Sequence, residues 1–175
     1  VKTDVFKAVI NSDGGTLARL ELLQYLDQNN QHGLVEWFKR LIGQPVPTDE
    51  VRPVTLMEDG SPATRYVAQT GLLNPDDKGP HFPTHLTPMR LKEGPLALVE
   101  GKDVLEVTFE SGPQGGLKYV KTYVFKRGDY SIRVKHQVVN VGDQPRDVQL
   151  YLQLVRHGTV PGTTMFGTNT FTGPA

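Results

Sequence analysis

The stretch Tyr130-Ser-Ile-Arg-Val-Lys-His-Gln-Val138 alternates apolar or aromatic residues with polar ones. Successive side chains of a β-strand point to opposite faces of its sheet, so a period of two is typical of a half-buried strand. The sequence therefore predicts a strand here with one buried face. The residues on that face are Tyr130, Ile132, Val134, His136 and Val138.

Two more strand patterns flank this stretch. Leu117 to Phe125 is rich in β-branched and aromatic residues, which suit a pleated and packed surface. Asp147 to Val155 alternates again. Short connections separate the three patterns, at Lys126–Asp129, where Gly128 can take a positive φ, and at Asn140–Pro145. We expect a meander of three consecutive antiparallel strands, the last of which buries Val148, Leu150, Leu152 and Leu154.

The remaining chain predicts further short strands separated by turn residues, which favours a large antiparallel β-sandwich and a single domain over residues 1–175. The expected strands are Asp4–Ile10, Thr16–Gln24, Arg52–Met57, Thr64–Gln69, Met89–Leu91, Leu96–Val99 and Val104–Glu110.

One segment has a helical period. Its apolar residues lie at the spacing of one helical face, and Gly43 and Pro45 follow as stop signals. We expect a short amphipathic helix over Leu34–Ile42 that covers one end of a sheet; the alternative is a helix that lies on a membrane surface through Trp37 and Phe38.

Composition excludes some classes of protein. The chain has no cysteine, so it forms neither disulfides nor thiolate metal sites, and its formal net charge of zero argues against a general nucleic-acid binder. The charge is uneven, because residues 117–156 carry eight Lys or Arg and three Asp or Glu. This basic segment forms either a solvated sheet face or a face for anionic lipid or an acidic partner. The start at Val1, inside a strand pattern and without a signal peptide, indicates an excised segment of a longer protein.

Candidate catalytic and metal-ligating residues are few. His81 and His85 flank Pro83, which excludes a helix, and in a strand their rings would lie about 13 Å apart, too far for one ion. We interpret both as surface loop histidines. His136 has no identifiable partner and is interpreted as a packed structural histidine. Arg127-Gly-Asp129 spells an adhesion tripeptide but suits a hairpin turn for geometric reasons alone. No cofactor is expected.

Several motifs together resemble a known family. These motifs are Phe125-Lys-Arg-Gly-Asp-Tyr130 with the following strand and Val139-Asn-Val-Gly142, and, in the same order along the chain, Val1–Val5, Ile10–Gly15, Tyr66–Leu72 and Thr170–Ala175. The chain resembles the large periplasmic domain of YidC, the inner-membrane protein insertase of Gram-negative bacteria. The core and turn markers of the resemblance are Phe125, Gly128, Asp129, Tyr130 and Val134.

The resemblance implies a β-supersandwich like that of galactose mutarotase, on the periplasmic side of the inner membrane. It implies a noncatalytic interaction domain that assists insertion and folding of inner-membrane proteins, and it transfers no catalytic residue. The implied partners are the Sec translocon, as SecYEG and SecDF, and nascent inner-membrane proteins. The family's domain continues beyond the match to Ala175, so we expect this chain to be truncated at its C-terminal side.

The alternative is a sugar-binding or aldose-epimerase-like protein on the same fold, since fold alone does not fix function. Such an enzyme needs a histidine acid and a glutamate base on a sugar ring. His136 or His85 could supply the acid, but the sequence does not place the glutamate. A cleft that brings a histidine and a carboxylate within about 5–7 Å would favour this alternative.

Overall fold

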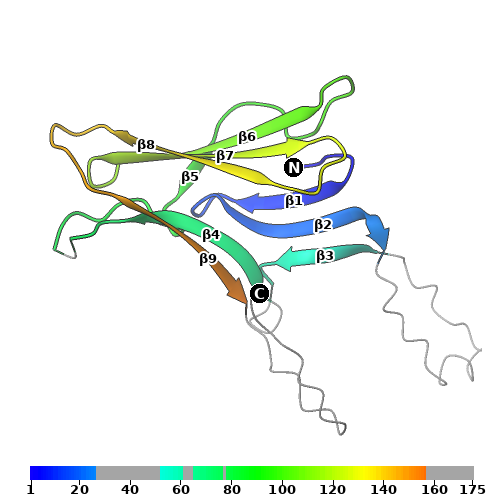
Figure 1. The fold of residues 1–175 in the computed structure, drawn as a ribbon, viewed down its shortest axis with the longest axis horizontal. Coiled ribbons are helices and arrows are strands. Elements are labelled where there is room, and N and C mark those ends of the chain that lie inside the picture. Colours follow the sequence, from blue (N-terminus) through cyan, green and yellow to red (C-terminus); the bar gives the residue numbers. More distant parts are fainter. Residues whose placement is uncertain (27–51, 61–64, 77, 157–175) are drawn as a thin grey trace, which may run out of the picture.

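Two antiparallel β-sheets packed face to face make up the described part of the chain (Figure 1). The computed structural model describes residues 1–26, 52–60, 65–76 and 78–156. One sheet has five strands in the order β1-β2-β3-β4-β9, and the other has four in the order β5-β6-β7-β8. The strands are β1 (Phe6–Asn11), β2 (Thr16–Leu26), β3 (Pro53–Glu58), β4 (Tyr66–Leu73), β5 (Met89–Leu91), β6 (Val104–Ser111), β7 (Leu117–Lys126), β8 (Arg133–Asn140) and β9 (Gln149–Arg156).

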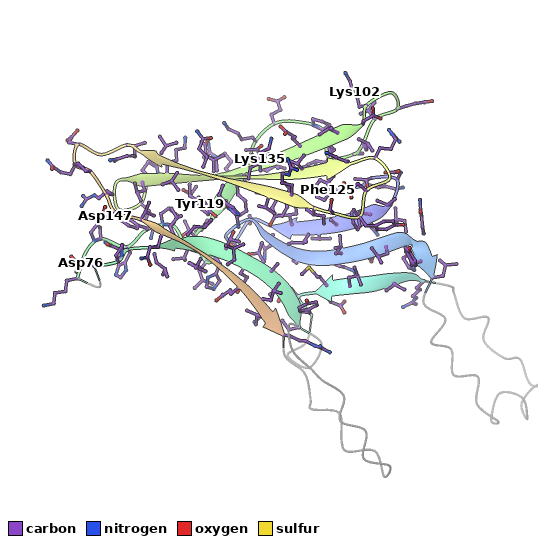
Figure 2. The ribbon with its side chains drawn as sticks, in the orientation of Figure 1. Asp76, Lys102, Tyr119, Phe125, Lys135 and Asp147 are labelled. Atoms are coloured by element: carbon purple, nitrogen blue, oxygen red, sulfur yellow. The ribbon has the colours of Figure 1, made fainter. Side chains whose placement is uncertain are left out.

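The core lies between the sheets, where side chains from both meet (Figure 2). One face of β7 is buried along its whole length, because the four-stranded sheet turns it toward the other sheet. The residues on this face, each at most 4% exposed, are Leu117, Tyr119, Lys121, Tyr123 and Phe125. The five-stranded sheet contributes Phe6, Ala8, Leu17, Leu20 and Leu72. The prediction of an antiparallel β-sandwich is confirmed.

Most of the predicted strands form close to their predicted bounds. The predicted hairpin between Leu117–Phe125 and the next strand is confirmed, since β7 and β8 pair antiparallel over eight residues, from Leu117↔Asn140 to Val124↔Arg133. Leu96–Val99 does not form a strand; Ala97 makes an isolated bridge to Lys2 instead. The predicted helix at Leu34–Ile42 lies outside the described residues.

The predicted three-stranded meander is wrong at its third strand. β9 does not pair with β8; it crosses to the other sheet and pairs with all eight residues of β4, from Leu73↔Gln149 to Tyr66↔Arg156. The connection after Asn140 contains Gly142 and Pro145 and is long enough to cross the roughly 10 Å between packed sheets. The alternating pattern of β9 determines which side chains share a face but does not specify the neighbouring strand. The prediction that β9 pairs with β8 failed for this reason.

The leucines of β9 lie on the core face but are not covered. Leu150 is the cross-strand partner of buried Leu72, and Leu152 is the partner of Thr70, which accepts a hydrogen bond from Tyr119 of the opposite sheet. Leu152 and Leu154 are nevertheless 71% and 58% exposed. The prediction that this face is buried is therefore wrong in the chain as described. We name the exposed apolar residues of this strand the β9 leucine face: Val148, Leu150, Leu152 and Leu154.

The strand β8 begins at Arg133, three residues later than predicted. Tyr130 turns away from the ladder, because its hydroxyl donates a hydrogen bond to Gln24 of β2 and its ring packs edge-on against Phe6. Tyr130 and Val138, which we expected on the buried face, are 39% and 36% exposed. Ile132 and Val134 do pack against the core, as predicted.

Candidate functional site

The turn between β7 and β8 carries most of the family markers. Phe125 is 1% exposed and stacks on Tyr123 with ring centroids 6.4 Å apart. Gly128 has φ +68°, a conformation that side-chain-bearing residues rarely adopt, and its amide donates to the Asp4 carboxylate at 2.8 Å. Asp129 accepts hydrogen bonds from the amide and the hydroxyl of Ser131, which together hold the pKa of its carboxyl below the usual value. These contacts stabilise the conformation of the turn, so its residues have a structural role.

The same turn ties the two sheets together. Asp4 and Gln24, which bind Gly128 and Tyr130, belong to the N-terminal segment and to β2 of the five-stranded sheet. Arg127 donates to the carbonyl oxygens of Val99 and Lys102. The side chains of the Arg-Gly-Asp tripeptide are thus engaged within the fold.

His136 lies at the inter-sheet space and contacts the buried tyrosine of β7. The Tyr119 hydroxyl lies 2.7 Å from His136 Nδ1 and 3.3 Å from the Thr70 hydroxyl, and the two rings stack with centroids 5.9 Å apart. Burial raises the pKa of Tyr119 to about 12, so the hydroxyl stays protonated at neutral pH. Burial and the nearby charge of Lys121 lower the pKa of His136. These contacts agree with the interpretation of His136 as a packed histidine.

Lys121 is the least expected residue of this region, since its side chain is buried in the core at 1% exposure. Its ammonium group donates to the carbonyl oxygens of Gly14 at 2.5 Å and of Gly15 at 3.4 Å, in the turn between β1 and β2. The Tyr123 hydroxyl donates to the same Gly15 oxygen at 2.7 Å. Burial lowers the pKa of Lys121 to about 8. Carbonyl dipoles therefore compensate a buried cation here in place of a carboxylate.

His85 is not the free surface histidine that we predicted. Its Nδ1 lies 2.5 Å from the Tyr151 hydroxyl of β9, which also accepts a hydrogen bond from the His85 amide at 3.0 Å. Burial and the charge of Lys121 lower the pKa of His85. His81, by contrast, is exposed, as predicted. The β4–β5 loop thus brings one histidine of the pair to β9 and leaves the other at the surface.

We call His85, Tyr119, Lys121, His136 and Tyr151 the inter-sheet polar cluster. Within the described residues, the interactions of its two histidines involve tyrosine hydroxyls and Lys121, and no carboxylate. The histidine–glutamate pair of an epimerase is therefore not assembled by the described residues. Sequence reasoning missed Lys121, although its position between Tyr119 and Tyr123 on the alternating face of β7 was a usable signal.

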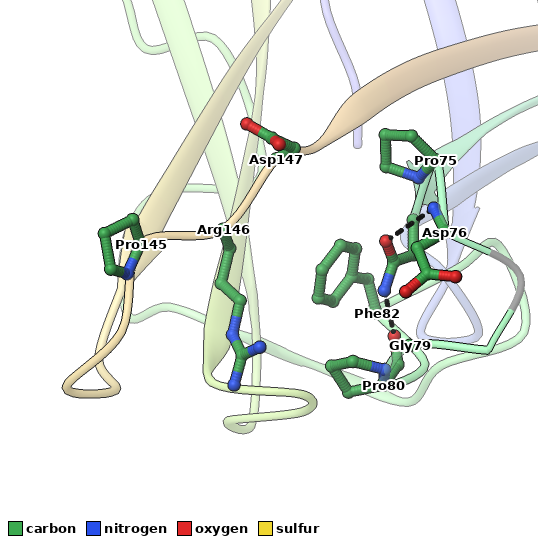
Figure 3. Close-up of a pocket in the computed structure, with 9 residues that line it drawn as sticks. Pro75, Asp76, Gly79, Pro80, Phe82, Pro145, Arg146 and Asp147 are labelled. Atoms are coloured by element: carbon green, nitrogen blue, oxygen red, sulfur yellow. Dashed lines mark hydrogen bonds between the residues drawn. The ribbon is translucent and has the colours of Figure 1, made fainter.

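A surface cleft of about 330 Å³ opens near the start of β9 (Figure 3). The β4–β5 loop supplies one wall, with Pro75, Asp76 and Phe82, and the crossover between the sheets supplies Arg146 and Asp147. Asn74 braces the loop wall, because its side chain donates to the Pro80 carbonyl oxygen and accepts from the Asp76 amide. The cleft lining combines a phenyl ring and prolines with side chains of both charges.

Comparison with known proteins identifies the family. The family description YidC periplasmic domain matches residues 43–175. "Membrane protein insertase YidC" of Bordetella pertussis is 38% identical over the whole chain, and the protein of the same name from Burkholderia thailandensis is 38% identical over 99% of it. That of Aromatoleum aromaticum is 33% identical over the whole chain.

The chain spans about a quarter of the length of these curated relatives, between 26% and 28% in the three cases. Within the described residues, no helix is long and apolar enough to cross a membrane. The family match includes β3 to β9, strands of both sheets, and begins after β1 and β2. The chain therefore belongs to the YidC periplasmic domain family.

Proposed function

We propose that this chain is a noncatalytic periplasmic interaction domain of a YidC-type insertase, which assists the insertion and folding of inner-membrane proteins. Family membership carries this proposal: the relatives that match the whole chain at 33–39% identity are named membrane protein insertases. The chain accounts for about 27% of those proteins, so the activity of the whole insertase is assigned here only by inference from its relatives.

The composition of the inter-sheet polar cluster supports a noncatalytic role. General acid–base chemistry on a sugar ring needs two groups of opposite function within reach of one substrate. The cluster offers two histidines of lowered pKa beside a cation, within the described residues, and both histidines already bind tyrosine hydroxyls. Polarimetry on freshly dissolved glucose or galactose should show mutarotation at the buffer rate. A rate clearly above buffer would support the epimerase alternative instead.

The proposed partners are components of the Sec translocon, SecYEG and SecDF, and nascent inner-membrane proteins. We place the peptide contact at the cleft beside β9, whose lining includes a phenyl ring, Arg146 and Asp147. No cofactor enters the proposal.

Photo-crosslinking in the full-length insertase in its native membrane tests these partners. A photoreactive residue is placed at Arg146 beside the cleft, at Arg133 on the four-stranded sheet, or at Lys7 on the five-stranded sheet. We expect adducts with a Sec subunit or a nascent chain from Arg146 and fewer from Lys7. Absence of adducts from all three positions would contradict an interaction role for this domain.

We also propose that polypeptide outside the described residues covers the β9 leucine face. The β9 leucine face supports this, since Leu152 and Leu154 lie on the core face of their sheet and are exposed. Large aliphatic side chains on a core face are normally covered by a second sheet.

A further inference from the structure

The outer face of the four-stranded sheet is strongly basic. Residues that alternate with the buried face of β7 point away from the core, and their cross-strand partners share that face. Among the described residues of β5 to β8 and Lys92, six cations lie on this face against two carboxylates, a difference of +4 before the turn residue Asp129 is counted. We name this set the basic face: Arg90, Lys92, Lys118, Lys126, Arg133 and Lys135, with Glu106 and Glu110.

The carboxylates neutralise only part of the basic face. Glu110 pairs with Lys118 at 2.5 Å and with Lys92 at 3.2 Å, and Glu106 pairs with Lys135 at 2.7 Å. Among the described residues, Arg90 on β5, Lys126 on β7 and Arg133 on β8 are exposed and make no close ion pair. The Asp129 carboxylate, in the turn between β7 and β8, interacts electrostatically with Lys126 and Arg133.

The outer face of the other sheet is different in charge. There Lys7 pairs with Glu21, and Arg19 bridges Glu21 and Glu58 at 2.8 and 3.0 Å. Among the described residues there, the ion pairs of Lys7 and Arg19 involve as many carboxylates as cations, and Arg65 pairs with Asp59. The excess of positive charge is therefore a property of one face of the sandwich and does not follow from the chain as a whole, whose net charge is zero.

The residue types of the basic face favour a lipid surface over a protein partner. Protein interfaces concentrate their binding energy in buried aromatic residues near the centre of the contact. The described residues of the basic face and its intervening positions include no Phe, Tyr or Trp; the neutral residues there are Val, Thr and Gln. A broad array of cations without such a centre matches a fluid array of phosphates, which imposes no fixed contact geometry.

We propose that the basic face docks on anionic phospholipid headgroups of the membrane beside which the domain lies. The docking is electrostatic and peripheral, through Arg90, Lys126 and Arg133, which are exposed and make no close ion pair with the described residues. It orients the four-stranded sheet toward the bilayer and leaves the cleft near Arg146 accessible from the side. This inference uses the family's periplasmic location and does not depend on the proposed Sec partners.

Vesicle flotation with the 175-residue chain tests the docking. The probes are vesicles of phosphatidylcholine alone and vesicles that also contain phosphatidylglycerol. We expect the chain to float with the phosphatidylglycerol vesicles, to remain unbound with the neutral ones, and to be released as salt is raised, because salt screens exposed charges.

A matched pair of variants locates the surface. Arg90→Gln with Arg133→Gln removes two charges from the basic face, and Lys78→Gln with Arg156→Gln removes two exposed charges from the β4–β5 loop and from β9. We expect the first variant to bind phosphatidylglycerol vesicles about 30-fold less strongly, about fivefold for each charge, and the second to bind nearly as the wild type. Circular dichroism confirms that both variants fold.

Each result of the vesicle experiments either supports or overturns the proposed lipid docking. Binding to phosphatidylglycerol vesicles that falls only in the basic-face variant supports the proposal. The proposal would be overturned if both variants lost binding equally, if the chain bound neutral vesicles equally well, or if it bound no vesicles. Absence of binding would leave an acidic protein segment as the partner of the basic face. Photo-crosslinking of Sec subunits tests the proposed function, and vesicle flotation tests lipid docking. Failure of lipid docking would therefore leave the proposed function unaffected.

Discussion

The ammonium group of Lys121, on β7, donates a hydrogen bond to the carbonyl oxygen of Gly14 at the turn between β1 and β2. The bond joins the two sheets through the core. Position 14 requires glycine, because its φ is +62° and a Cβ there would lie 2.3 Å from the His85 carbonyl oxygen. A buried cation, a glycine turn and the loop that carries His85 thus meet at one point.

Lys121 should make the stability of the domain depend on alkaline pH. Burial lowers its folded pKa from 10.5 to about 8, so between these values the unfolded chain binds the proton that the folded chain has released. Stability then rises with pH in this window. Relative to Lys121→Met, the wild type should gain about 2 kcal/mol in free energy of unfolding between pH 8 and 10, measured by urea denaturation. A constant difference between the two proteins would contradict a buried, titrating lysine.

His136 should have the corresponding effect at acid pH. Its folded pKa lies below 6.5, so as pH falls from 7 the unfolded chain takes up protons first and stability is lost. His136→Gln cannot titrate and should lose less stability between pH 7 and 5, while its amide oxygen can still accept from Tyr119. His81→Gln, at an exposed loop position, is the control and should behave as the wild type. Identical pH profiles for all three proteins would show that His136 is not desolvated.

The two faces of β8 should respond differently to the same charge. Val134 packs against the core, so Val134→Asp should lower the free energy of unfolding by about 3 kcal/mol through lost apolar burial and a poorly solvated carboxylate. Lys135→Asp removes a surface ion pair with Glu106 and should cost about 1 kcal/mol or less. Thermal melts followed by circular dichroism compare them. Equal losses would mean that β8 is buried on both faces.

Substitutions on the β9 leucine face test the proposal that further polypeptide covers it. Leu152→Ser with Leu154→Ser should leave the stability of the 175-residue chain within about 0.5 kcal/mol, because both side chains are exposed. In an extended form of the protein that includes the covering polypeptide, the same pair should cost several kcal/mol. Leu72→Ser, in the core, should destabilise both forms.

Light scattering provides a second measurement of the same face. The unextended chain, with aliphatic residues exposed on β9 at a sheet edge, should self-associate more than the extended one. A monomeric short chain that is as stable as the extended one would contradict the proposed cover of the β9 leucine face.

Some of the fold could be predicted because it depends on local pattern. The period of two placed Ile132 and Val134 toward the core, and Gly128 marked the turn that joins β7 to β8. Both features arise within a few residues, since the pleat of a strand and the φ of a glycine are local properties. The motifs around Phe125–Tyr130 also led to the family, which the comparisons confirm.

Other features depended on residues far apart in the chain. The partner of β9 is β4, more than 75 residues earlier, and the pattern of alternating leucines is the same whichever strand lies beside it. His85 meets Tyr151 at a separation of 66 residues, and Lys121 meets Gly14 at 107. The sequence by itself determined which residues form strands and which side chains share a face, because sterics act locally. The tertiary structure alone decided which strands are neighbours and which polar groups meet in the core, because these choices minimise the free energy of the whole sandwich.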